Sequence, residues 1–234
     1  MQPTVALAVE DYLPVLLSFL GLLWLVQMVF RMYRPAGYLA AVGLALIFAG
    51  GFLKATEKLL GATTGQGVSW MNDSLFVLLG PGFTCVAWAV WCGQRAAAGR
   101  SSPKPIWLVP TVISAVALGA AAYAAATQTG RGWFFIMLTL TVLATVATIV
   151  LLIRQSWQQN MRVVSLALVV YLFATLMLNG MARTPSETLA VAWGKQMVNT
   201  AASGIFAFAA YHLSRATIQL LRLDSQTLRV FGNP

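Results

Sequence analysis

Charged side chains are scarce in this chain. Of its 234 residues only 9% are Asp, Glu, Lys or Arg, whereas a soluble domain carries about 25%. So small a charged fraction excludes a cytosolic enzyme, a secreted disulfide scaffold and a disordered tail.

Histidine and cysteine are almost missing as well. The single histidine, His212, excludes a bis-histidine haem and a histidine-rich metal site. Cys85 and Cys92 would lie about 10 Å apart on one helix, so we expect no bond between them. The sequence therefore indicates neither a metal site nor a bound cofactor.

Long hydrophobic runs take the place of charge, and 59% of the residues are hydrophobic. A membrane-spanning helix needs about 20 apolar residues in sequence. Seven stretches bounded by charges or turn residues meet this need, at 11–32, 37–60, 69–93, 106–127, 132–154, 161–183 and 187–214. We therefore predict an all-α, polytopic membrane protein with seven transmembrane helices.

The basic residues are divided unevenly between the two ends of these helices. With the N-terminus outside, ten of the 15 Lys and Arg residues fall on the inner side and five on the outer side. Because basic loops are retained in the cytoplasm, this bias predicts an external N-terminus and an internal C-terminus in the cell inner membrane. The same bias explains the net charge of +9, because basic residues on the inner side face anionic lipids. We therefore predict membrane lipids as partners and no nucleic acid.

The chain is predicted to form one transmembrane domain over 1–234. We divide it into a first helix triplet (1–93), a linker with helix four (94–131), a second triplet (132–214) and a tail (215–234). Arg215, Arg222 and Arg229 recur every seven residues in the tail and share one helix face. This pattern predicts an amphipathic helix on the inner leaflet.

The two triplets show a weak internal repeat. Spans three and seven align at an offset of 123 residues, which pairs Trp70 with Trp193 and Phe83 with Phe206. Spans two and six align at the nearly equal offset of 125. A single linker helix between the triplets makes the predicted repeat parallel.

This plan of three, one and three helices resembles the topology of microbial opsins and of the sugar-transporting SWEET and PQ-loop proteins. The run Asn72 to Phe76 with Asp73, followed by Pro81, is similar to the third opsin helix, where a carboxylate precedes a mid-helix proline. The PQ dipeptide is missing from the spans. The resemblance covers the whole chain as topology only.

Polar side chains gather in the outer halves of spans two, three, six and seven. Each is costly at membrane depth unless it is paired or functional. We predict that they line an outward-facing ligand pocket between these helices. The candidate ligand-binding residues are Lys54, Glu57, Asn72, Asp73, Asn179, Arg183, Lys195, Gln196 and Asn199. Charged groups that merely reach the head groups from helix ends are the alternative interpretation.

Within this set, Asp73 and Lys195 are expected to approach each other across spans three and seven as an ion pair.

Three residues are candidate hinges. Pro81 and Gly82 interrupt span three, and Gly204 weakens the corresponding part of span seven. Paired interruptions of this kind are typical of transporter sites, although a static kink for packing is the alternative. Helix four is rich in small residues, which favours close packing and possible homo-oligomer formation through this helix.

These features favour a membrane protein that binds and transports a small polar or amphiphilic solute. A membrane sensor or receptor subunit without transport is the alternative. An opsin-like photoreceptor is disfavoured, since Lys195 lies too close to the helix end for a Schiff base and Val191 stands where a counter-ion carboxylate is expected. No sequence motif supports catalysis, so an enzyme is the less favoured class.

Overall fold

The computed structural model describes residues 4–127, 130–181 and 188–231, with side-chain detail up to residue 223. The described residues form eight helices with no β-strand among them. Their bounds are α1 Val5–Glu10, α2 Tyr12–Met32, α3 Arg34–Thr64, α4 Ser69–Ala97, α5 Leu108–Thr127, α6 Gly132–Gln158, α7 Arg162–Met181 and α8 Leu189–Phe231. The predicted all-α fold is confirmed.

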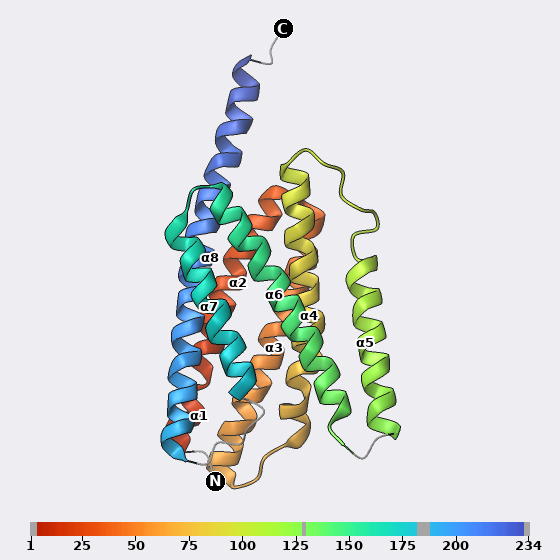
Figure 1. Ribbon diagram of the computed structural model, residues 1–234, viewed down its shortest axis with the longest axis vertical. Helices are drawn as coiled ribbons and strands as arrows, with labels where there is room; N and C mark the ends of the chain where they lie inside the picture. The colour runs from red at the N-terminus through yellow and green to blue at the C-terminus, as the bar shows by residue number, and fades with distance from the viewer. Residues whose placement is uncertain (1–3, 128–129, 182–187, 232–234) are drawn as a thin grey trace.

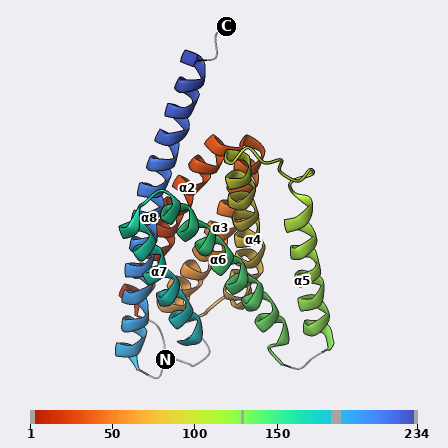
Figure 2. The ribbon, with the colours of Figure 1, turned by 45° about the horizontal axis from the view of Figure 1, so that its top comes forward.

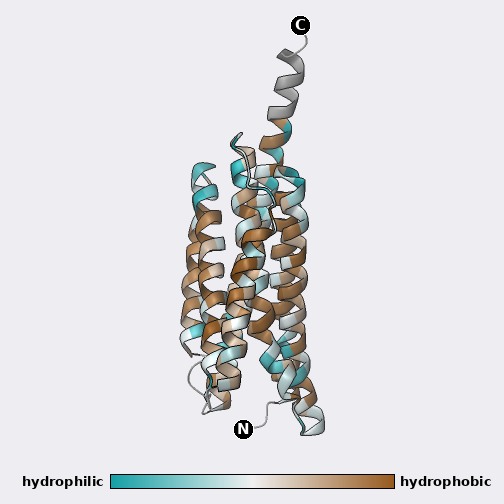
Figure 3. Ribbon diagram, turned by 90° about the vertical axis from the view of Figure 1, so that its right-hand side faces the viewer, coloured by the Kyte–Doolittle hydropathy of each residue, from teal (hydrophilic) through white to brown (hydrophobic). Residues whose placement is uncertain are grey.

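Six helical segments are long and apolar enough to cross a membrane. They are α1 and α2 taken together, α3, α4, α5, α6 and α7. Hydrophobic residues cover the middle of the helices and hydrophilic residues collect at both ends (Figure 3). The chain is therefore consistent with a helical membrane protein.

The seventh predicted span, α8, is not among these six. Its polar residues Gln196, Ser203 and Ser214 are buried, so they face the interior of the bundle. The helix also continues without a break from Leu189 to Phe231, where we expected a span ending near residue 214. At about 1.5 Å per residue it is roughly 65 Å long, and its C-terminal end projects beyond the other helices (Figure 1). Contact of this end with the inner leaflet stays a prediction.

Six of the long helices form a closed ring. Going round it, α2 packs against α3, α3 against α4, α4 against α6, α6 against α7, α7 against α8, and α8 against α2. Helix α5 packs on α4 and α6 from outside, and two views show it standing apart from the ring (Figures 1 and 2). The ring order largely decides which side chains can meet, because the most extensive contacts are those between neighbouring helices.

The core lies along the axis of this ring. Fully buried side chains from α2, α4, α6 and α8 meet there, among them Met28, Val90, Leu152 and Leu213. Small residues let α3 approach α4 closely, and a Cβ atom added at Gly43 would lie 2.6 Å from the carbonyl oxygen of Gly82. This contact gives Gly82 a packing role, and its hinge role remains a prediction.

A buried hydrogen-bond network ties three helices together at the end of the ring far from the N-terminus. Gln155 of α6 accepts a bond from Gln94 Nε2 of α4 at 2.9 Å and donates one to Thr217 Oγ1 of α8 at 2.8 Å. Gln159 Nε2 donates to the same Thr217 oxygen at 2.9 Å. Paired amides of this kind hold buried helices in register.

We expect Gln155→Leu to lower the free energy of unfolding by about 1–3 kcal/mol, because it removes a hydrogen-bond partner from the half-buried Gln94 and from the buried Thr217. The measurement is the midpoint of thermal unfolding, followed by fluorescence-detected size-exclusion chromatography. Gln158→Leu is the matched control, since Gln158 is exposed three residues further along α6. Equal midpoints for the two variants would contradict the prediction.

Candidate functional site

A cavity of about 510 Å³ lies inside the ring, in the half nearest the N-terminus. It is bounded by the first half of α2, the second half of α3, the first halves of α4, α6 and α8, and the end of α7. Leu7 of α1 also contributes to its wall. Small-molecule sites in proteins are commonly about 300–1,000 Å³ in volume, so the cavity has the size of such a site.

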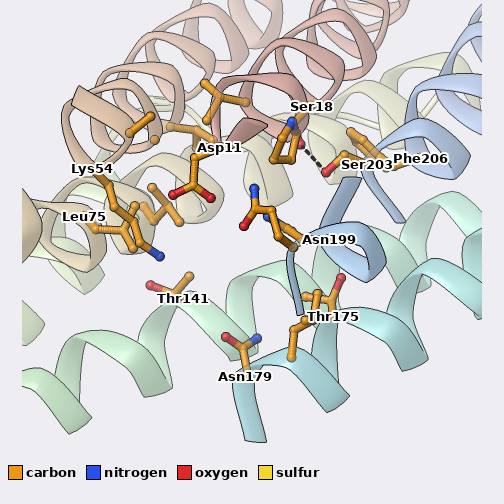
Figure 4. A pocket seen from close by; sticks show the side chains of 18 of the residues that line it. Asp11, Ser18, Lys54, Leu75, Thr141, Thr175, Asn179, Asn199, Ser203 and Phe206 are labelled. Atoms are coloured by element: carbon orange, nitrogen blue, oxygen red, sulfur yellow. Dashed lines mark hydrogen bonds between the residues drawn. The ribbon is translucent and has the colours of Figure 1, made fainter. Parts of the chain in front are cut away.

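Polar side chains occupy one end of the cavity. Asp11 is held at the junction of α1 and α2, where its backbone N–H bonds to Leu7 O. It forms an ion pair with Lys58 of α3. One turn earlier on α3, Lys54 extends its amine into the same space, as Figure 4 shows. The ion pair joins the chain's first helices to α3 at the polar end of the cavity.

Amide and hydroxyl groups complete this polar end. Asn179 of α7 and Asn199 of α8 face the cavity (Figure 4). Gln196 lies one turn from Asn199, is 6% exposed, and its Nε2 has no hydrogen-bond partner. A buried donor without a partner is costly, which makes Gln196 a candidate for contact with a ligand.

The deeper end of the cavity is apolar. The rings of Tyr171 from α7 and Phe206 from α8 stack with centroids 4.9 Å apart. Phe83 of α4, Ile47 of α3 and Leu22 of α2 line the same region. Ten residues separate Gln196 from Phe206 on α8, so the polar and apolar ends are about 15 Å apart along that helix.

A hydrogen bond between α2 and α8 borders the cavity midway. Ser18 Oγ donates to Ser203 Oγ at 3.2 Å, as drawn in Figure 4. Nearer the polar end, Thr200 of α8 donates to the carboxylate of Glu10, which is buried next to Asp11. These bonds fix the first helices against the start of α8.

Five of the nine sequence-predicted ligand-binding residues line the cavity: Lys54, Asn179, Lys195, Gln196 and Asn199. The other four do not contribute to its described wall. Asn72 and Asp73 are exposed on α4, and Arg183 lies outside the described residues. Glu57 is turned toward the α3–α4 loop, where a Cβ atom added at Gly67 would lie 2.6 Å from its Oε1.

The expected pair between Asp73 and Lys195 is not formed. Lys195 Nζ instead donates to Met181 O of α7 at 3.1 Å. The physical reason is the ring order, because α4 packs on α3 and α6 whereas α8 packs on α2 and α7. The carboxylate in the cavity wall is Asp11, and its partner is Lys58.

Sequence reasoning missed the contributions of the first and fifth spans. Asp11 and Ser18 are seven residues apart on one face of the first span, and Thr141, Thr145 and Thr148 recur at helical spacing in the fifth. Thr141 and Thr145 line the cavity. The spacing of these polar side chains was the signal that could have placed them in the site, since residues four and seven apart share a helix face.

The described residues contain no group of three or more His, Cys, Asp or Glu side chains placed to hold a metal ion. Cys85 and Cys92 are both free thiols, as the sequence predicted. No protein family, curated protein or solved structure matches this chain.

Proposed function

We propose that this chain is a seven-helix membrane protein that binds and transports a small polar or amphiphilic solute. The observation that carries the proposal is the cavity, which combines a polar end, an apolar end and the buried, unpartnered amide of Gln196. A site used only for packing has no need of such a donor, since a leucine there would be less costly.

The ring order supports the seven-helix part of the proposal. Helix α8 closes the ring between α7 and α2 and lies beside them through the depth of the bundle. Helices α2 to α4 and α6 to α8 follow one another round the ring with α5 outside, an order compatible with two parallel triplets and a linker helix. Oligomer formation through α5 remains part of the proposal, because its outer face carries exposed apolar residues such as Val112 and Val116.

The orientation that we propose from the basic bias has the cavity on the outer side of the inner membrane. We expect a cysteine introduced at Thr4 to react with an impermeant thiol reagent on intact cells, and one at Asn233 to react only after permeabilisation, because the basic bias puts the C-terminus inside. Both experiments start from a chain in which Cys85 and Cys92 are replaced by alanine. Labelling in the reverse pattern would turn the cavity toward the cytoplasm and contradict the proposed direction.

The binding proposal is tested by native mass spectrometry of the purified protein. We expect a co-purifying small molecule that is lost in Ala192→Trp, because Ala192 lines the cavity and the indole would fill it. Ala190→Trp is the matched control on the exposed side of the same helix turn. Both variants must first elute from a size-exclusion column as a single peak at the position of the wild type, which shows that they fold. No adduct, or an adduct retained equally by both variants, would contradict a ligand in this cavity.

Transport and sensing are distinguished by measuring uptake of the bound molecule into proteoliposomes. Once the bound molecule is identified, a transporter in proteoliposomes accumulates it and Ala192→Trp abolishes the accumulation. A sensor subunit binds the molecule without accumulation, and that result would replace transport by the alternative function.

A further inference from the structure

We infer that the ligand of this cavity is a single-chain organic acid, with its carboxylate at Lys54 and Gln196 and its apolar body toward Tyr171 and Phe206. The inference rests on the proposed binding function and gives the chemical class of the ligand. It follows from the charges, the hydrogen-bond donors and the shape of the cavity.

The charges favour an anion. Among the described lining side chains, Lys54, Lys58 and Lys195 are basic and Asp11 alone is acidic. Asp11 is engaged by Lys58, and the neighbouring carboxylate of Glu10 accepts a bond from Thr200. Lys54 is therefore a cation in the described wall of the cavity whose charge a ligand would balance.

The hydrogen-bonding groups favour an acceptor on the ligand. Gln196 presents an Nε2 donor that the protein leaves without a partner. The hydroxyls of Thr141 and Thr145 donate to backbone oxygens of their own helix, at 2.8 and 2.7 Å. A carboxylate accepts several hydrogen bonds and donates none, so it is the head group that suits both Lys54 and Gln196.

The shape favours a molecule with an apolar body. Beyond Ser18 and Ser203 the cavity continues between aromatic and aliphatic side chains, with the stacked rings of Tyr171 and Phe206 in its wall. A small hydrophilic anion would leave this region empty. An apolar chain attached to the carboxylate fills it and gains the free energy of burial.

The head group is tested with three probes that share one apolar body: octanoate, octylamine and 1-octanol. Each is used in tritiated form, and its binding to the protein in phosphatidylcholine nanodiscs is measured with empty nanodiscs subtracted. Octanoate is expected to bind at least about tenfold more tightly than either of the others, since a hydrogen bond between charged groups is stronger than a neutral one. Octylamine would place its ammonium group beside the charge of Lys54.

The residues are tested with the same probes. Lys54→Met is expected to weaken octanoate binding by about tenfold or more, and Gln196→Leu by a few fold, with 1-octanol affected much less by either. Lys104→Met is the control for loss of a positive charge, because Lys104 is exposed on the loop between α4 and α5. Octanoate should bind this control as it binds the wild type.

Three outcomes overturn the inference. If octylamine or 1-octanol binds as tightly as octanoate, the cavity accepts amphiphiles without selecting an acid, and the proposed function stands without the inference. If octanoate fails to bind while native mass spectrometry still finds a cavity-dependent adduct, the ligand belongs to another class. If phosphatidylglycerol added to the nanodiscs displaces octanoate, the anionic site belongs to a lipid head group.

Discussion

Lys58→Met is expected to destabilise the protein by roughly 2–3 kcal/mol. The substitution leaves the carboxylate of Asp11 buried, with 9% of its side chain exposed, and without its ammonium partner. Removing one partner of a fully buried pair typically costs about 3–5 kcal/mol, and the 30% exposure of Lys58 reduces that figure. The effect is measured as the fall in the midpoint of thermal unfolding in detergent.

The opposite substitution should be milder. In Asp11→Asn the Lys58 side chain keeps its charge but can turn its amine toward water, because a long lysine stem is flexible. The double variant Asp11→Asn with Lys58→Met should then be more stable than Lys58→Met alone. Lys104→Met, on an exposed loop, should leave the midpoint unchanged. Additive effects in the double variant would mean that the two charges do not interact.

Gly43→Ala should be the most damaging of the small substitutions. The new Cβ atom would lie 2.6 Å from the carbonyl oxygen of Gly82, a backbone atom that cannot move without shifting α4. Gly82→Ala meets Ile47 Cγ1 at 2.7 Å and Gly43 O at 3.0 Å, so the same interface is strained from its other side. Overpacking of this kind typically costs about 1–3 kcal/mol, and we expect the upper part of that range for Gly43→Ala.

Gly204→Ala is the matched control for these two variants. Its Cβ atom would meet only Leu17 Cδ1, at 3.9 Å, which is ordinary van der Waals contact. Because alanine favours a helix over glycine by up to about 1 kcal/mol, this variant should be as stable as the wild type or more so. A rise in the unfolding midpoint of Gly82→Ala would contradict the prediction. It would mean that α3 and α4 separate easily enough to admit the new Cβ atom, as a hinge at Gly82 requires.

The membrane helices could be predicted from the sequence for a simple physical reason. A bilayer has a fixed thickness, so a helix that crosses it carries a run of apolar residues of known length. Each of the seven predicted stretches coincides with helix in the described residues, with ends within a few residues of the predicted ones except at the end of α8, and with a break at Asp11 between α1 and α2. Six of them meet the criterion of an apolar span, and α8 is not among them because polar residues such as Lys195, Gln196 and Asn199 interrupt its apolar sequence.

Which side chains meet inside the bundle was decided by the tertiary structure. Hydropathy locates Lys54, Asn179 and Asn199 in the halves of their helices that we predicted to be outer, and these three do reach one cavity. It contains no information on which helices are neighbours. The expected pair of Asp73 with Lys195 came from the predicted repeat of the two triplets, and it joins helices that do not pack together.

The ring order supplied what the sequence could not. By packing α2 between α3 and α8, it brings Asp11 to Lys58, Ser18 to Ser203 and the buried amide of Gln196 to the cavity. The sequence by itself thus determined the all-helical class of the chain and its long apolar helices, because these depend on each segment's own composition. The cavity depends on contacts between segments far apart in the chain, and only the packed bundle decides those.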